Sequence, residues 1–352
     1  MSDHTLISPD ARARSATRPR GTSFAGLVGV ELRRLWWRRM AKVALLGVVL
    51  FTGLSVFTVY QATSPETLAQ QLDSYNAQVE QFPTMVKECK QAQADARANG
   101  EANADFGCDQ MAGQQMSPAD FGLVEPAVPA IVATLSTASV YVYGFLAFLL
   151  GASFVGAEFS AGSMGNWLTF QPRRLRVAAS KLLAAAGGGL GIAAVGLALS
   201  TLGAFLVTSI NRPGADAPRL PPMPVDTADP VAQLVLRCVA LIVLGGLGGA
   251  VVGLIMRHTA AVLGLVVGWA VLVEGAIAAL LFNGALQPWL VQINLKAFLE
   301  KGASYYRTVC DANGCQSAEV PVSYTHSWVY LIVFTVVLTV ISLWSFRRRD
   351  VT

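Results

Sequence analysis

The chain has 352 residues, of which 53% are hydrophobic and only 14% are charged. Soluble domains average roughly 45–50% apolar and about 25% charged residues, which excludes an ordinary soluble globular protein. The formal net charge is +4, but the basic residues gather at the ends of long apolar runs. Membrane orientation explains such a distribution without nucleic acid. The composition therefore predicts an integral membrane protein with no nucleic-acid partner.

Two segments precede the first long apolar run. Residues 1–23 are polar with four Arg, and they predict a disordered cytoplasmic tail. Residues 24–42 are basic and amphipathic, which is typical of an interfacial helix that lies in the lipid headgroup plane. The helical repeat places three polar residues opposite the apolar face, with the arginines towards anionic lipid: Glu31, Arg34 and Arg38. Basic residues that merely flank a span on its inner side are the alternative.

Six apolar runs predict six transmembrane helices, since a crossing takes about 20 apolar residues. The predicted spans are about 43–60, 127–155, 182–210, 235–255, 260–282 and 327–346, within a permease domain that covers 43–346. The segments between spans that we place in the cytoplasm, together with both ends of the chain, hold 17 of the 26 Lys and Arg residues, so both termini are predicted to be cytoplasmic. In the fourth span Gly245, Gly249 and Gly253 recur every four residues, which predicts close helix packing.

Two long segments, 61–126 and 283–326, are predicted to be external. In the first, Ser64-Pro65-Glu66 is a strong helix start, Pro83 is expected to kink or end that helix, and Asn99-Gly100 marks a turn. The second begins with an amphipathic stretch and continues as a β-hairpin around Asn313-Gly314.

The cysteines separate by predicted compartment. Cys238 lies in the fourth span, and the other four are external: Cys89, Cys108, Cys310 and Cys315. An even number of cysteines in an oxidising compartment predicts two disulfides. Of the three possible pairings we favour the local ones, Cys89–Cys108 and Cys310–Cys315. A metal site is the weaker alternative, because the three histidines are scattered and offer no companion ligands.

A polar island interrupts the apolar runs between the second and third spans. It contains Glu158, then Gly162-Ser163, then Pro172-Arg173-Arg174, and finally Lys181. This order resembles the cytoplasmic segment between the second and third spans of type-2 ABC exporter permeases. The resemblance extends to the span pattern and to the interfacial helix before the first span. It implies an all-α polytopic membrane protein of the cell membrane.

In the resembled family this island is a coupling helix that docks into a cleft of a separate ATPase subunit. The resemblance therefore implies an ATPase-coupling role for Glu158, Gly162, Ser163, Pro172, Arg173, Arg174 and Lys181. It also implies export as the direction, an ABC ATP-binding subunit as a partner, and a second permease copy or paralogue. The chain has no GxxxxGK[ST] loop, so it is expected to carry no cofactor and to be no enzyme itself. ATP and Mg would be bound by the partner.

Two features are candidates for a translocation pathway or interface. The second span carries a polar band that includes Ser136, Thr137, Tyr141 and Tyr143. Glu274 is the only acid within an apolar segment, and many members of the resembled family carry a Glu at a similar place. Its carboxylate is costly in the membrane, so it should face the bundle or a wet cavity, or hold helices together. Two other functions remain open: a secondary transporter that uses Glu274 as an ion or proton site, and a membrane sensor with an external ligand-binding domain.

Overall fold

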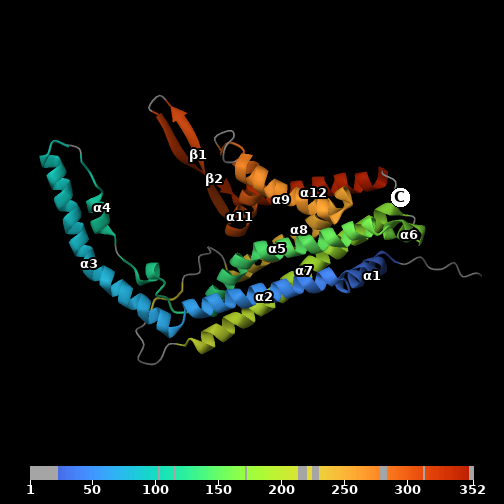
Figure 1. Ribbon diagram of the computed structural model, residues 1–352, viewed down its shortest axis with the longest axis horizontal. Coiled ribbons are helices and arrows are strands. Elements are labelled where there is room, and N and C mark those ends of the chain that lie inside the picture. The colour runs from blue at the N-terminus through green and yellow to red at the C-terminus, as the bar shows by residue number, and fades with distance from the viewer. Residues whose placement is uncertain are drawn as a thin grey trace, which may run out of the picture.

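A computed structural model of the chain describes residues 23–101, 104–114, 116–170, 173–212, 220–223, 230–277, 284–311 and 314–348. Most of the described residues form helices that run along one common direction (Figure 1). The predicted disordered tail lies outside the described residues except for Ser23. The Ser23 hydroxyl accepts a hydrogen bond from the Gly26 N–H at 3.1 Å and so caps the first helix, α1 (Phe24–Trp36).

Among the described residues, five helices are long and apolar enough to cross a membrane: α2 (Arg39–Ala62), α5 (Val128–Ser160), α7 (Arg174–Ile210), α8 (Val231–Met256) and α12 (Tyr324–Arg348). The shortest of them, α2, has 24 residues. At a rise of about 1.5 Å per residue it measures roughly 36 Å, which exceeds the hydrocarbon thickness of about 30 Å. These helices match five of the six predicted spans, and each extends beyond the predicted bounds at one end or at both.

The predicted span 260–282 has a different form. It consists of α9 (Thr259–Gly268) and the π-helical segment η3 (Trp269–Ile277), and residues 278–283 lie outside the described part. The apolar helical stretch Thr259–Gly275 is shorter than the other five apolar helices. A sixth crossing therefore stays a prediction.

Small residues let the central helices α5 and α8 pack closely. A side-chain carbon added at Gly245 would lie only 2.5 Å from the carbonyl oxygen of Gly144, and one at Gly249 would meet the carbonyl of Phe148. Because a carbonyl of the facing helix cannot retreat as a side chain can, only Gly fits at these positions. The predicted packing role of these glycines is confirmed.

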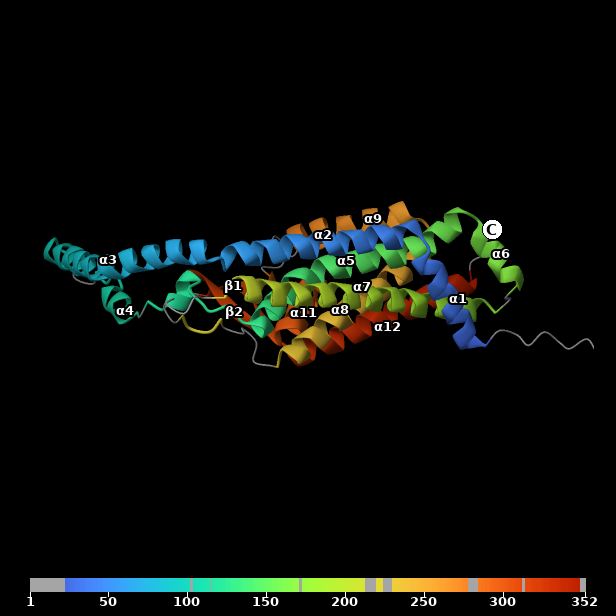
Figure 2. The same ribbon diagram turned by 90° about the horizontal axis from the view of Figure 1, so that it is seen from below.

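The two ends of the bundle carry different elements. The helices α1 and α6 (Ser163–Phe170) and the end of α12 lie at one end, which we call the α6 end (Figure 1). At the opposite end, the α3 end, the long helix α3 (Pro65–Ala98) and a β-hairpin project from the bundle (Figures 1 and 2). The first described helix and the end of the last one therefore lie at the same end of the bundle (Figure 1).

The helix α3 begins where the sequence predicts. The Ser64 side chain accepts a hydrogen bond from the Thr67 N–H at 3.3 Å, and Pro65 occupies the first helical position. The helix continues through Pro83 and ends only at Ala98, so the expectation that Pro83 ends it is wrong. Pro83 lacks an N–H but is exposed, and Figure 1 shows α3 bending along its length.

After Ala98 the chain turns back along α3. Gly100 has φ +102°, which confirms the predicted turn. The short helices α4 (Cys108–Gly113) and η2 (Pro118–Phe121) follow on the way back to α5. The ring of Phe121 packs edge-on against that of Tyr75 with their centroids 5.2 Å apart, which holds the returning chain against α3.

The second segment that is predicted to be external contains η5 (Gln287–Trp289), α11 (Val291–Glu300) and the strands β1 (Gly302–Asp311) and β2 (Gly314–Ser323). The strands pair antiparallel with Asp311 opposite Gly314, which confirms the predicted hairpin. Tyr305 and Val322 of the hairpin form a small core with Ala297 of α11. The hairpin is therefore anchored on α11.

Candidate functional site

Five charged side chains from four elements meet at the α6 end: Glu31 and Arg34 of α1, Arg38 at the start of α2, Glu158 of α5 and Lys181 of α7. We call them the charge cluster. The side chains of Glu31 and Lys181 are 0% exposed and that of Glu158 is 2% exposed. Charged groups are rarely buried so completely unless they are paired.

Lys181 joins the two carboxylates. Its Nζ atom lies 2.9 Å from Glu31 Oε2 and 2.6 Å from Glu158 Oε2. The aromatic ring of Phe154 completes the environment of the ammonium, with its centroid 4.9 Å from Nζ. A lysine in the apolar helix α7 is thus held in its site by partners from α1 and α5.

Two arginines bind the same carboxylates from the outer side of the cluster. Arg38 Nη2 donates a hydrogen bond of 2.7 Å to Glu158 Oε1, and its Nη1 donates to the carbonyl of Ser153 at 3.3 Å. Arg34 lies 3.4 Å from a carboxylate oxygen of Glu158 and 3.4 Å from one of Glu31. Three cations therefore share two carboxylates, and the cluster has one positive charge in excess.

The charge cluster fixes α1 to the junction at which α5, α6 and α7 meet. Removing one partner of a buried ion pair typically costs about 3–5 kcal/mol, because an uncompensated charge stays buried. Here each carboxylate bridges at least two elements, so one substitution affects several helix contacts at once. The cluster is a rigid joint between the first helix of the chain and the segment that includes α6.

The turn into α6 depends on local geometry. Gly162 has φ +66°, a left-handed conformation that suits Gly, and its N–H donates to the carbonyl of Phe159 at 3.1 Å. The Ser163 hydroxyl donates to the carbonyl of Glu158 at 3.3 Å. Met164 is 1% exposed and belongs to the main hydrophobic core, so it anchors the start of α6.

The structure divides the residues of the predicted coupling segment into two groups. Glu158 and Lys181 are buried and meet each other, whereas Gly162 and Arg173 are exposed and Arg174 is half-buried. Pro172 lies outside the described residues. A protein that approaches this end can therefore touch Gly162 and Arg173 directly, but it reaches the buried pair only through the helices that carry it.

Sequence reasoning places Glu31, Arg34 and Arg38 on a face turned to lipid headgroups, and the structure turns Glu31 inwards instead. The interfacial segment 24–42 is also not one helix, because α1 ends at Trp36 and α2 begins at Arg39. One signal was available. Lys181 is a base at the start of an apolar run, and no acidic residue lies near it in the sequence, so its partner has to come from another segment.

The predicted polar band of the second span does not line one common surface. Ser136 and Tyr143 are buried, and the Tyr143 hydroxyl shares a hydrogen bond with that of Thr52 on α2. Tyr141 is 45% exposed, and the Thr137 hydroxyl donates to backbone carbonyls of its own helix. The band therefore divides between the bundle interior and an outer face of α5.

Glu274 binds the start of α11. Its Oε1 atom accepts from the Val291 N–H at 2.9 Å and from Trp269 Nε1 at 3.0 Å, and its Oε2 atom accepts from the Gln292 N–H at 3.1 Å. No side chain of the preceding residue, Leu290, caps this helix. The carboxylate thus supplies the missing cap, which supports the structural interpretation of Glu274 over an ion site.

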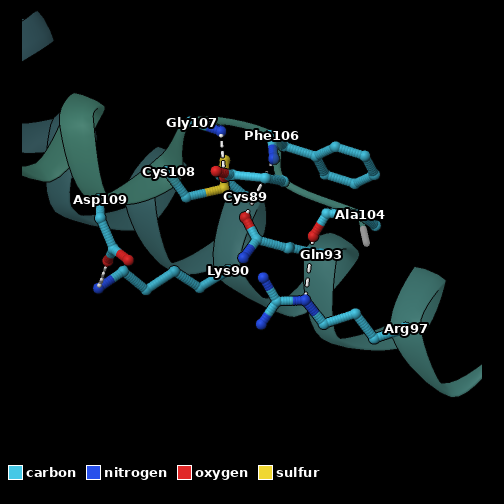
Figure 3. The surroundings of a disulfide bond; sticks show 10 residues. Cys89, Lys90, Gln93, Arg97, Ala104, Phe106, Gly107, Cys108 and Asp109 are labelled. Atoms are coloured by element: carbon cyan, nitrogen blue, oxygen red, sulfur yellow. Dashed lines mark hydrogen bonds and ion pairs between the residues drawn. A yellow bond between two sulfur atoms is a disulfide. The ribbon is translucent and has the colours of Figure 1, made fainter. Parts of the chain in front are cut away.

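The disulfide between Cys89 and Cys108 is present, as predicted, and joins α3 to α4 (Figure 3). Three neighbouring contacts reinforce it. Lys90 pairs with Asp109 at 2.9 Å, the Phe106 N–H donates to Gln93 Oε1 at 3.1 Å, and Arg97 donates to the carbonyl of Ala104 at 3.0 Å.

The second predicted disulfide falls in the β-hairpin. The strand register places Cys310 directly opposite Cys315, while their side chains lie outside the described part. The pairing is thus compatible with the backbone and stays a prediction.

The described residues contain no group of three or more His, Cys, Asp or Glu side chains placed to hold a metal ion. In comparisons with known proteins, no family model, curated protein or solved structure matches this chain significantly.

Proposed function

We propose that this chain is the membrane-spanning permease subunit of an ATP-driven ABC transporter, and that it works as an exporter. The observation that carries the proposal is the junction of α5, α6 and α7. There the residues that resemble the coupling segment of type-2 ABC permeases lie before, at the start of and after a short helix, α6, at one end of a bundle of apolar helices. A short helix that joins two long ones at the end of a bundle is suited to receive a push from a separate protein.

In this proposal the exposed and the buried residues have different roles. Arg173 and the turn at Gly162 belong to the surface that meets the ATPase. Glu158 and Lys181 transmit its movement, because their ion pair joins the helix before α6 to the helix after it at 2.6 Å. Through Glu31 the same movement reaches α1. A joint made of buried ion pairs resists shear, since any displacement would separate charges in a medium of low dielectric.

The proposed complex contains a second permease copy or paralogue and two ATP-binding subunits, which hold ATP and Mg. Both termini of the chain are proposed to be cytoplasmic, on the same side of the cell membrane as the ATPase. The positions of α1, α6 and the end of α12 at one end of the bundle support this orientation (Figure 1). So do the arginines at that end, Arg33, Arg39, Arg347 and Arg348 among them.

The proposal is tested by charge reversal at the exposed surface. Arg173→Glu should prevent co-purification with the proposed ABC ATP-binding subunit, and it should abolish stimulation of that subunit's ATP hydrolysis in proteoliposomes. Arg173 is exposed at the start of α7, so the substitution leaves the charge cluster intact.

Arg307→Glu is the matched control, because Arg307 is an exposed arginine of β1 at the opposite end of the molecule. It should leave both association and hydrolysis unchanged. Full association of the Arg173→Glu protein, or an equal loss with Arg307→Glu, would contradict a docking surface at the α6 end.

A further inference from the structure

An open depression of about 510 Å³ lies where α1 ends and α2 begins, and Val30, Arg33, Arg34, Trp37 and Arg38 line it. We call it the elbow pocket. Its outer wall is apolar and exposed, since Trp37 is 72% exposed and Val30 is 46% exposed. The remaining lining consists of three guanidinium groups. A pocket that combines arginines with an exposed Trp is suited to a molecule with an anionic head and an apolar body.

The charge of the elbow pocket follows from the burial of the cluster behind it. The carboxylates of Glu31 and Glu158 are 0% and 2% exposed, whereas the Arg34 and Arg38 side chains are 37% and 24% exposed. The acids are therefore hidden and the arginines that bind them face outwards. Arg33 is exposed and adds a further positive charge, and no acidic side chain lines the pocket. The surface is positive although acids lie directly beneath it.

The position of the elbow pocket indicates the source of the anion. The pocket lies at the first turn of α2, a helix long enough to cross the hydrocarbon layer. A site at the end of such a helix lies at the level of the lipid headgroups, where Trp is enriched. Figure 2 shows α1 leaving the end of α2 at a sharp angle. In addition, no side chain caps the N-terminus of α2.

We propose that the elbow pocket binds one anionic phospholipid. Arg33, Arg34 and Arg38 bind the phosphate, since guanidinium groups match phosphate oxygens in charge and in bidentate geometry. The acyl chains lie along Trp37 and Val30. A zwitterionic lipid offers the same phosphate, but its cationic headgroup is repelled by the arginines. Because Arg34 and Arg38 also bind Glu158, the lipid shares these cations with the charge cluster. This site does not depend on the proposed transport function.

Native mass spectrometry of the detergent-purified full chain tests the proposal. The probes are dioleoylphosphatidylglycerol, dioleoylphosphatidylcholine with the same acyl chains, and soluble glycerol phosphate. The variant Arg33→Gln/Trp37→Ala removes two exposed side chains of the pocket and leaves the charge cluster in place. The matched control is Arg348→Gln/Trp344→Ala, because the guanidinium of Arg348 stacks on the ring of Trp344 at 4.3 Å on α12, at the same end of the bundle.

We expect one tightly bound phosphatidylglycerol per chain in the wild type and in the control. The pocket variant, and Arg33→Gln alone, should bind it at least about fivefold more weakly, as each basic residue near an anionic lipid surface contributes about 1 kcal/mol. Equal retention of the two lipids, or unchanged binding by both pocket variants, would overturn the site. Binding of glycerol phosphate as tightly as the lipid would overturn the lipid as its occupant.

Discussion

At the α6 end of the bundle, charged partners are separated by 120 and 150 positions in the chain, as in Arg38–Glu158 and Lys181–Glu31. At the α3 end, α3 and the chain that returns through α4 form a helical hairpin, which we call the α3–α4 hairpin. A disulfide between cysteines only 19 positions apart closes it. The first end buries the side chains of Glu31, Glu158 and Lys181, whereas α3 contains no buried residue. One end is therefore held by tertiary contacts and the other by local ones.

This difference has a thermodynamic consequence. A joint of buried ion pairs exists only when the whole bundle is assembled, so it unfolds with the bundle. The α3–α4 hairpin can unfold locally while the bundle stays folded, because few contacts link it to the bundle. Substitutions at the two ends should therefore produce different kinds of change, global at the α6 end and local at the α3 end.

The largest effect is expected for Lys181→Met. It leaves two buried carboxylates with only the arginines on their outer side, and we expect a loss of about 3–5 kcal/mol in bundle stability. The thermal midpoint of the purified protein in detergent measures it. Lys296→Met is the control, since Lys296 forms an exposed pair with Glu300 at 3.9 Å. Surface pairs contribute about 0–1 kcal/mol, so similar midpoint losses in both variants would refute the cluster as a buried joint.

Replacing both Cys89 and Cys108 by Ser should lower the stability of the α3–α4 hairpin and leave that of the bundle unchanged. Loop entropy assigns roughly 3 kcal/mol to a cross-link across 19 residues. We expect rapid proteolysis between α3 and α4 without a change in the thermal midpoint of the bundle. Reduction of the wild type should reproduce the same cleavage. A lowered thermal midpoint of the double-Ser variant would instead show that the α3–α4 hairpin and the bundle unfold together.

At Gly162 two reasons for glycine can be compared: the left-handed backbone conformation and contact with a partner protein. A left-handed conformation costs roughly 1–2 kcal/mol for most residues and less for Asn. An added side-chain carbon would meet nothing within 4 Å at this position, so sterics inside the chain play no part. We therefore expect Gly162→Asn to be more stable than Gly162→Ala in thermal unfolding. The reverse order would indicate that the positive φ is not what requires glycine here.

Glu274→Ala should weaken the start of α11 while leaving the bundle folded. Loss of a helix cap costs about 0.5–2 kcal/mol, which corresponds to up to roughly thirtyfold faster hydrogen exchange. Exchange at the Val291 and Gln292 amides, which donate to this carboxylate, measures the effect. Glu274→Gln keeps a hydrogen-bond acceptor, so its exchange rates at these two amides should lie between those of the wild type and of Glu274→Ala. Unchanged exchange in both variants would remove the capping role.

The smallest effect is expected for the exposed pair Lys90–Asp109 at the disulfide (Figure 3). The hydrogen bond and charge of Lys90 lower the pKa of Asp109 below 3.8. Because the folded-state pKa is the lower one, this stabilisation is present above pH 3.8 and is lost as the pH falls through the lowered pKa. Asp109→Asn should therefore change the rate of proteolysis in the α3–α4 hairpin only slightly at neutral pH, and its difference from the wild type should shrink as the pH falls. A difference between the two proteins that grows on acidification would contradict the lowered pKa.

Features with a local signal could be predicted from the sequence. The start of α3, the turn at Asn99-Gly100, the first disulfide and the β-hairpin each depend on residues close together in the chain. The five long apolar helices could also be predicted, because bilayer thickness sets their length. Their ends were less accurate: α7 begins at Arg174, whereas the prediction began at 182. Basic residues can extend a helix into the interface, and hydropathy does not report that.

The charge cluster could not be predicted, because its formation depends on how separate helices pack. Composition suggests that Glu31 belongs with the headgroups, and only the contact between α1 and α7 places it beside Lys181. Glu274 shows the same limit. Its partners are backbone N–H groups 17 and 18 positions away. Almost every residue has such a donor, so the residue types do not indicate which ones Glu274 binds. The interruption between α1 and α2 also lacks a Gly or Pro signal.

The contacts at the junction of α2 and α3 make α3 an extension that moves together with α2. Asn211, at the end of α7, donates to the Tyr60 carbonyl at 2.9 Å and to the Thr63 hydroxyl at 2.8 Å, and so fixes the base of α3 to the bundle. The 34 residues of α3 measure roughly 50 Å along the axis. In Figure 1 α3 points away from the axis of α2, so a twist of α2 by about 10° would sweep the far tip through several ångströms. A spectroscopic label at Asn99 would magnify rotations that are too small to detect within the bundle.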